Sequence, residues 1–142
     1  MIKIVTAAQM QQLEHRTIGE ARIPATTLME RAGSGVASCI ERWGGPVSGK
    51  TITVVCGKGN NGGDGYVAAR LLRRRRAHVR ILTMASPSEL SRDAALMYRQ
   101  FVKAANRTSV LSYKSKDAAL SLFRESDLLV DALLGTGLSS SV

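Results

Sequence analysis

The feature that most constrains this chain is a glycine-rich segment, Gly57 to Gly65, which holds five glycines in nine residues. The preceding run Thr-Ile-Thr-Val-Val-Cys, residues 51–56, is rich in β-branched side chains and typical of a buried parallel strand. The residues that follow, about 65–75, have a helical pattern. A strand, a glycine loop and a helix begin a βαβ unit, in which bare backbone and a helix N-terminus can approach a pyrophosphate. A tight turn without a ligand is the alternative.

The loop has the spacing G-x-G-x-x-G, but two common classes of nucleotide-binding protein do not fit the rest of the sequence. A dinucleotide dehydrogenase would place an acidic residue at the end of the second strand, where this chain has Thr83-Met84-Ala85. A P-loop would end in Gly-Lys-Ser or Gly-Lys-Thr, whereas Lys58 comes too early. Plain hydride transfer and P-loop phosphate binding therefore lose support.

Two helices are expected before the first strand. Thr6 and Gln9 have the spacing of a capping box and open a helix that runs to about Glu20. The side chains expected to face the core from this helix are Met10, Leu13 and Ile18. A second helix begins near Pro24 and ends at Gly44-Gly45-Pro46. Its apolar residues recur at three- and four-residue steps, which predicts a core-facing stripe made of Leu28, Met29, Ala32, Val36, Cys39, Ile40 and Trp43.

Beyond the glycine loop, strand and helix patterns alternate. Ser86, Pro87 and Glu89 suit the N-cap, N1 and N3 positions of a helix over residues 86–105, and Ser115 caps another to about Glu125. The expected strands are residues 78–82, 109–113 and 127–132. This order predicts a Rossmann-like three-layer α/β/α fold with a mainly parallel sheet, right-handed crossovers and two leading helices.

The length of 142 residues suits one domain, residues 1–142, and no second one. A doubly wound sheet would normally continue past the turn at Gly135-Thr136-Gly137 with another helix and further strands. We therefore expect a domain that is incomplete at its C-terminus and inactive as it stands.

Composition narrows the ligand and the compartment. A net charge of +9 favours an anionic ligand, and the basic run 73–76 lies at a helix end without interleaved aromatic residues, which makes nucleic-acid binding an unfavoured interpretation. Cys39 and Cys56 match neither a disulfide framework nor a zinc site, and both are expected to be buried, reduced thiols. No apolar run could span a membrane and no signal peptide is recognisable, so a cytoplasmic protein is expected.

Three polar residues of the glycine loop are candidates for chemistry. Asp64 is unusual, because a carboxylate beside a phosphate cradle repels its ligand; it is either an N-cap or a functional group. Asn60 and Asn61 tolerate left-handed turn geometry, and their amides can also serve a cation, a ribose or a nicotinamide.

Residues 54–70, Val-Val-Cys-Gly-Lys-Gly-Asn-Asn-Gly-Gly-Asp-Gly-Tyr-Val-Ala-Ala-Arg, resemble the signature of the YjeF N-terminal domain, the NAD(P)HX epimerases. Two further segments are similar to that family: residues 28–33, Leu-Met-Glu-Arg-Ala-Gly, and residues 131–138, Asp-Ala-Leu-Leu-Gly-Thr-Gly-Leu. The resemblance implies interconversion of the R and S forms of NADHX and NADPHX, which are hydrated nicotinamide dinucleotides, in metabolite repair with a bound potassium ion.

The resemblance also implies a set of site residues. Asn61 and Asp131 would ligate potassium, whose preference for hard oxygen donors they match, although Asp131 could be a capping residue instead. The implied substrate-binding residues are Asn60, Asn61, Gly62, Gly63, Asp64, Gly135, Thr136, Gly137, Leu138, Ser139, Ser140 and Ser141. Family members continue into an Asp-x-Pro-Ser-Gly segment that completes the site. The expected partners are the substrate, a second copy in a homodimer, and a fused or separate ADP- or ATP-dependent dehydratase.

The substrate carbon bears a hydroxyl group next to a ring nitrogen, so inversion can proceed through loss of hydroxide to an iminium and addition of water on the other face. We hypothesise that Asp64 is the catalytic acid/base group and that Asp131 holds the cation, although either could serve binding alone. The rival interpretation is a noncatalytic nucleotide- or RNA-associated binding module of the same fold, which the basic charge suits.

Overall fold

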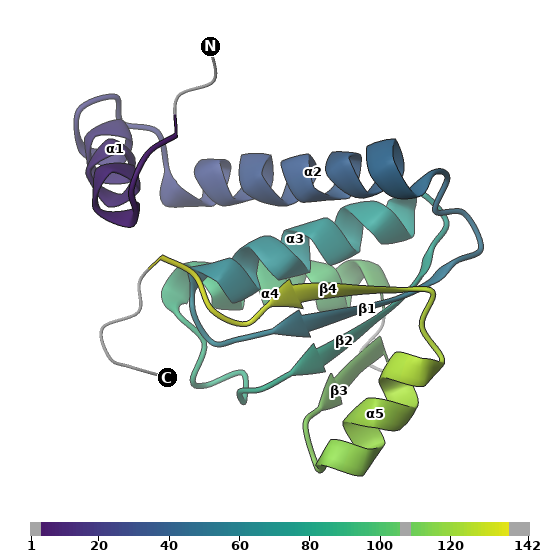
Figure 1. Cartoon of the computed structure of the whole chain (residues 1–142). Coiled ribbons are helices and arrows are strands. Elements are labelled where there is room, and N and C mark those ends of the chain that lie inside the picture. Colours follow the sequence, from purple (N-terminus) through teal and green to yellow (C-terminus); the bar gives the residue numbers. More distant parts are fainter. Residues whose placement is uncertain (1–3, 106–108, 137–142) are drawn as a thin grey trace.

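The computed structural model describes residues 4–105 and 109–136, which form helices packed around a parallel sheet (Figure 1). The leading helices are α1 (Ala7–Gly19) and α2 (Ala25–Gly44). The elements that follow are β1 (Thr51–Cys56), α3 (Asn60–Arg74), β2 (His78–Thr83), α4 (Arg92–Ala105), β3 (Val110–Ser112), α5 (Lys116–Arg124) and β4 (Leu128–Ala132). The strands are ordered β3-β2-β1-β4 with parallel pairing throughout. The predicted α/β class with a mainly parallel sheet is confirmed.

Helices cover both faces of the sheet, because its strands are apolar on both sides. One face packs against α3, and α2 and α4 pack against α3; the core on this side includes the fully buried Ile52, Tyr66 and Phe101. On the other face, Leu122 of α5 packs against Val55 of β1. Figure 1 shows α3 above the sheet and α5 below it, which gives the three layers of a Rossmann-like fold.

The order in which strands are added to the sheet reverses at β1, and this reversal positions the site. The chain passes from β1 through α3 to β2 on one side of β1, whereas β4 pairs on the other side. Cys56, Thr83 and Ala132 are in register, so the carboxyl ends of all three strands meet at one edge. Ligands of open α/β sheets bind beyond the carboxyl ends of strands at such a reversal. In Figure 1 the arrowheads point toward the end of the molecule where α1 lies.

Helix α1 begins as predicted but packs differently. The capping box is confirmed, since the Gln9 backbone N–H donates to Thr6 Oγ1 and the Gln9 side chain accepts from the Thr6 N–H. The prediction that Met10, Leu13 and Ile18 face the core is wrong, because these side chains are 39%, 48% and 40% exposed. The reason is that α1 lies beside the end of α2 rather than over the sheet (Figure 1).

The stripe predicted for α2 is also wrong in part. Met29 is buried as expected, but the other buried residues of α2 are Gly33 and Ala37, and Trp43 is 81% exposed. Helix α2 crosses α3 through its small residues, because a Cβ on Gly33 would lie 2.5 Å from Val67 Cβ. The expected inward residues that prove exposed are Ala32, Val36, Cys39 and Trp43.

Two helices begin at residues other than those predicted. Helix α3 starts at Asn60 instead of about residue 65, so the glycine run is itself helical. Helix α4 starts at Arg92 instead of residue 86. Ser86 and Glu89 do bond, with Ser86 N–H to Glu89 Oε2 at 2.8 Å, but they close an isolated turn. Ser91 is the residue that caps α4, through its Oγ to the Ala94 N–H at 3.3 Å.

The thiols and the basic run differ in their surroundings. Cys56 is buried as predicted and burial raises the pKa of its thiol well above the usual range, whereas Cys39 is exposed, which corrects the prediction for that residue. Within the basic run, Arg75 pairs with Glu41 at 2.9 Å and donates to the Ala37 carbonyl. In the part of the chain that the structure describes, no helix is both long and apolar enough to cross a membrane.

Candidate functional site

The glycine loop allows the ends of β1, α3 and β4 to lie in close contact. The Gly57 N–H donates to the Ala132 carbonyl at 3.0 Å, and a Cβ on Gly57 would collide with the carbonyl oxygen of Leu133. A Cβ on Gly62 would collide with the carbonyl oxygen of Gly57. Bare backbone is therefore required at both positions, because in each case the obstacle is main chain, which cannot rotate away.

Helix α3 points its N-terminus into the same region. Its N-cap is Gly59, which has no side chain, and no described residue caps the helix with a side-chain hydrogen bond. The first-turn N–H groups carry a partial positive charge, so this end of the helix suits an anionic group. The alternative that Asp64 is the N-cap is wrong, because Asp64 lies more than one turn inside α3.

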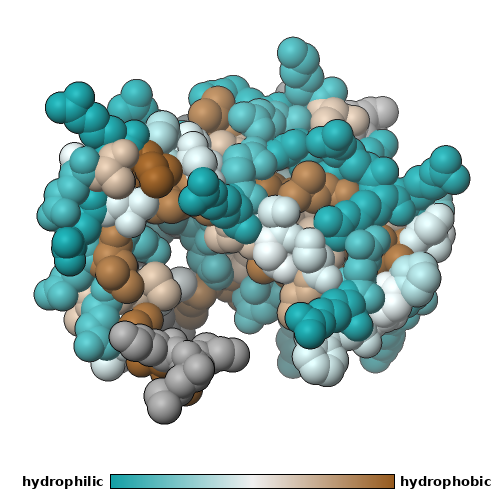
Figure 2. Space-filling view, turned by 90° about the horizontal axis from the view of Figure 1, so that it is seen from above, coloured by the Kyte–Doolittle hydropathy of each residue, from teal (hydrophilic) through white to brown (hydrophobic). Residues whose placement is uncertain are grey.

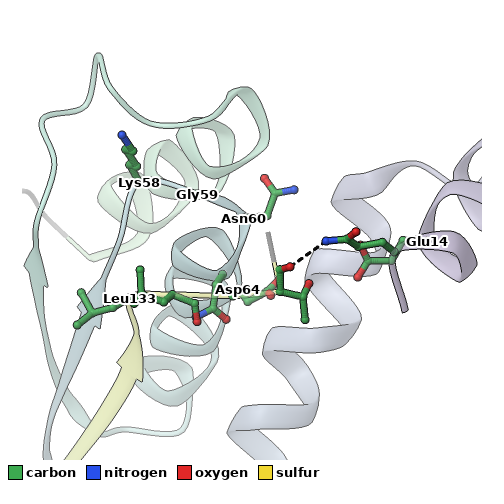
Figure 3. A pocket seen from close by; sticks show the side chains of 11 residues that line it. Glu14, Lys58, Gly59, Asn60, Asp64 and Leu133 are labelled. Atoms are coloured by element: carbon green, nitrogen blue, oxygen red, sulfur yellow. Dashed lines mark hydrogen bonds between the residues drawn. The ribbon is translucent and has the colours of Figure 1, made fainter. Parts of the chain in front are cut away.

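A cavity of about 550 Å³ opens at this junction (Figure 3). Its size is within the usual range for small-molecule sites. Three segments form its walls: α1, the glycine loop with the start of α3, and the turn after β4. The space-filling view shows a hollow between α1, on the left, and the rest of the molecule (Figure 2). The lining residues are Gln11, Glu14, Lys58, Gly59, Asn60, Asn61, Asp64, Leu133, Leu134, Gly135 and Thr136.

Side-chain amides tie these walls to one another. Asn61 Nδ2 donates to the Leu134 carbonyl at 2.9 Å, which joins α3 to the turn after β4. Gln11 Nε2 donates to the Thr136 carbonyl at 2.8 Å, which joins α1 to the same turn. Asn60 Oδ1 accepts a hydrogen bond from Ser91 Oγ at 3.0 Å, so its oxygen is directed at the cap of α4.

Asp64 has the electrostatic signature of a functional carboxylate. Burial, and to a smaller extent the negative charge of Glu14, raise its pKa from 3.8 to about 6. A carboxyl group with this pKa is partly protonated near neutral pH, so it can both donate and accept a proton. A perturbed group in a pocket at a strand crossover marks a candidate active site.

Comparison with known proteins agrees with this geometry. The family described as YjeF-related protein N-terminus matches residues 25–142. The chain belongs to this family. As a YjeF-related N-terminal domain it is 41% identical over 137 residues to the bifunctional NAD(P)H-hydrate repair enzyme Nnr of Moorella thermoacetica, covering 94% of this chain and 26% of that protein. It is 35% identical to the NAD(P)H-hydrate epimerase of Rhodobacter capsulatus over 144 residues, covering 98% of this chain and 65% of that one.

A solved structure supports the same assignment. The crystal structure of the yeast protein ynu0 matches with a TM-score of 0.79 at 26% identity, over 99% of this chain and 60% of the yeast chain. The YjeF-related chain thus spans between about a quarter and two thirds of the length of these three proteins.

The structure brings most of the sequence-predicted site of this YjeF-related domain together. Asn60, Asn61, Asp64, Gly135 and Thr136 line the cavity, whereas Gly62 and Gly63 are buried near the start of α3 and do not line it. Asp131 does not line it: its Oδ1 accepts from the Leu133 N–H at 2.9 Å, as in the capping alternative. The predicted residues that lie outside the described part of the chain are Gly137, Leu138, Ser139, Ser140 and Ser141.

Sequence reasoning missed Gln11 and Glu14 of α1, which form one wall of the pocket. Their spacing of three residues places them on one face of a helix, but nothing in the sequence indicates that this face turns toward the glycine loop. Lys58, dismissed as a P-loop lysine, also lines the cavity.

Proposed function

We propose that this domain catalyses the interconversion of the R and S forms of NADHX and NADPHX in metabolite repair. The relatives carry names of NAD(P)H-hydrate epimerases and repair enzymes, which supports this substrate class. The observation that carries the proposal is Asp64, a half-buried carboxyl with a pKa of about 6 in a cavity beyond the carboxyl ends of β1 and β4.

The reaction needs a proton donor and a shielded pocket. The substrate carbon carries a hydroxyl group beside a ring nitrogen, and protonation of that hydroxyl allows it to leave as water. Asp64 acts as the acid in this step, since its raised pKa leaves a proton on a fraction of molecules at neutral pH. Cys56 cannot serve as the acid in this step, because burial raises the pKa of its thiol and the thiol keeps its proton.

The charges around the cavity orient a dinucleotide in it. Among the described residues that line the pocket, Lys58 supplies the positive charge, while Glu14 and Asp64 are acidic. The pyrophosphate lies toward Lys58 and the uncapped N-terminus of α3, where both charge and dipole favour anions. The hydrated ring then lies toward Asp64. The two acidic side chains would repel the phosphates in the opposite orientation.

Potassium is the cation that we propose for this domain, held by Asn61 and Asp131. The donor chemistry fits, since an amide oxygen and a carboxylate are hard ligands, and both side chains bond to the turn formed by Leu133 and Leu134. A bound potassium ion would supply positive charge beside a pocket that holds two carboxylates.

We further propose a cytoplasmic location, which the two free thiols support, because reducing compartments keep cysteines unpaired. Apolar side chains exposed on α1 support a second copy of the chain as a partner. The bifunctional relative supports a second repair activity, a dehydratase, that works with this domain.

The test is the rate of R-to-S interconversion of NADHX in the full-length protein, followed by chromatography against the spontaneous rate. Asp64→Asn should lower the rate about 100-fold or more, as loss of a general acid does. The affinity for NADP, measured by calorimetry, should change little. Asp117→Asn, which removes a carboxylate from the exposed first turn of α5, is the matched control and should retain full activity. Equal loss of rate and affinity in Asp64→Asn would make Asp64 a binding residue only.

The second candidate function, a noncatalytic RNA-associated module, is favoured by the net charge of +9. The contacts of Arg75 with Glu41 and Ala37 weigh against it, because they use part of the densest basic run inside the fold. Thermal denaturation with NADP and with a short RNA separates the two functions. Stabilisation by RNA alone would favour the rival.

A further inference from the structure

Two carboxylates reach the cavity from different walls. Asp64 belongs to α3, whose position is set by the core, and Glu14 belongs to α1 (Figure 3). Glu14 lies one helical turn beyond Gln11, whose amide bonds to the Thr136 carbonyl at 2.8 Å. That bond turns the face of α1 carrying Glu14 toward the pocket.

The two carboxylates interact across the cavity, and neither forms an ion pair with another described residue. The charge of Glu14 raises the pKa of Asp64, which places the groups within electrostatic reach. None of the ion pairs formed by the described residues includes Glu14 or Asp64. Two like charges that face each other oppose folding, so their arrangement calls for a functional explanation.

Inversion at a carbon through loss and addition of water involves both faces of the ring. The hydroxyl group leaves from one face, where a proton donor is needed. Water adds on the opposite face, where a proton acceptor is needed. One carboxyl group on one wall cannot reach both positions without reorientation of the ring, whereas two groups on separate walls can.

We propose that Glu14 is a second acid/base group of the epimerisation, acting on the face of the ring opposite Asp64. This inference rests on the proposed epimerase function and extends it by one catalytic residue, carried on a helix that the sequence did not connect with the site.

The step balances without an added reactant. One carboxyl group gives its proton to the hydroxyl oxygen, the carbon–oxygen bond breaks, and water departs as the nitrogen lone pair forms the carbon–nitrogen double bond of an iminium. A water molecule on the other face forms the new carbon–oxygen bond, the π electrons return to nitrogen, and the opposite carboxylate takes the proton. Nothing is oxidised or reduced. The proton ends on the opposite wall, which is the starting state for the reverse reaction.

The experiment compares the wild type, Glu14→Gln and Glu14→Ala in the full-length protein, with NADHX as substrate and NADP as the binding probe. Glu14→Gln should slow interconversion roughly 100-fold, the usual effect of losing one acid/base group, with little change in NADP affinity. Formate should restore activity to Glu14→Ala, because the position is exposed and a small carboxylate can reach it. The matched control is Glu20→Gln, the same substitution at the end of α1 and outside the pocket, which should leave the rate unchanged.

The outcomes separate this inference from the function on which it rests. A wild type no faster than the spontaneous reaction would overturn the proposed function. An active wild type that is impaired by Asp64→Asn but not by Glu14→Gln would leave the function standing and overturn the role of Glu14. Loss of NADP affinity in parallel with rate, or loss of rate that formate does not restore, would also overturn it, because Glu14 would then be a binding or structural residue.

Discussion

Helices α3 and α1 both contribute acidic side chains to the same pocket, yet they are held in opposite ways. Helix α3 is buried along most of its length, and Gly62 and Gly65 allow it to touch the backbone of the loop and the side chains of β1 and β4. Helix α1 buries no side chain among the described residues and joins the pocket through Gln11. The difference shows that one wall of the site is fixed by the folding core and the other by surface contacts.

The sharpest way to test this contrast is the same substitution in both helices. Leu72→Ala on α3 removes a fully buried side chain and should lower the free energy of unfolding by about 3 kcal/mol. Leu13→Ala on α1, where the side chain is 48% exposed, should lower it by less than about 1 kcal/mol. Denaturant titration measures both. Equal losses would mean that α1 belongs to the cooperative core.

A second comparison pairs a glycine of the glycine loop with a glycine of α2. Gly62→Ala should destabilise the protein by about 2 kcal/mol, because the new Cβ meets the Gly57 carbonyl oxygen and one of two backbone segments must move. Gly35→Ala on α2 has open space around it and should be neutral or stabilising by up to about 1 kcal/mol, as alanine favours helix. Thermal unfolding of the two variants compares them directly. A stable Gly62→Ala with unchanged NADP affinity would remove the argument for close backbone approach.

Asp64 of α3 interacts electrostatically with Glu14 of α1, and the titration of Asp64 gives a third test. Its pKa is raised from 3.8 to about 6 in the folded state, so the folded protein holds the proton more tightly than the unfolded chain. The ionised carboxylate therefore opposes folding, fully above about pH 6 and not at all below pH 4. Asp64→Asn should accordingly be more stable than wild type at pH 7.5, by about 1 kcal/mol after allowance for solvent screening, and no more stable at pH 3.5. A constant difference at both pH values would contradict the raised pKa.

The smallest effect on global stability is expected at Gln11. Gln11→Ala removes the hydrogen bond from α1 to Thr136 and should change the unfolding free energy by less than about 1 kcal/mol. Amide hydrogen exchange in α1 should nevertheless become faster while exchange in α3 stays the same, since α1 opens locally. Gln12→Ala, exposed on the same helix and outside the pocket, is the control. Unchanged exchange in α1 would show that other contacts hold it.

The sequence predicts the sheet well because its signals are local. The β-branched run of β1 and the glycines that follow identify a strand, a turn and a helix without reference to other parts of the chain. The start of α3 was missed because glycine is a poor helix former, and here the packing of the fold overrides that preference. The stripe of α2 was misassigned because hydrophobicity favours large residues, whereas the contact with α3 is made by Gly33 and Ala37.

The site residues also divide into those with a local sequence signal and those placed by tertiary packing. Asn60, Asn61 and Asp64 were predicted because they belong to one continuous motif. Gln11 and Glu14 were not, because their place in the pocket depends on how α1 lies against the turn after β4, which is a tertiary property with no signal in the α1 sequence.

The hydrogen bonds at the end of β2 limit how this domain could be converted into a dehydrogenase. Thr83 is 4% exposed there, and its hydroxyl group lies 3.3 Å from the Tyr66 hydroxyl and donates to the Ala85 carbonyl at 2.9 Å. An acidic residue in this position, which dehydrogenases use to hold a ribose, would be a carboxylate enclosed by protein and would displace a satisfied hydrogen-bond network. Conversion into a hydride-transferring enzyme would therefore require the neighbourhood of Tyr66 to be redesigned together with Thr83, so no single substitution leads from this domain to a dehydrogenase.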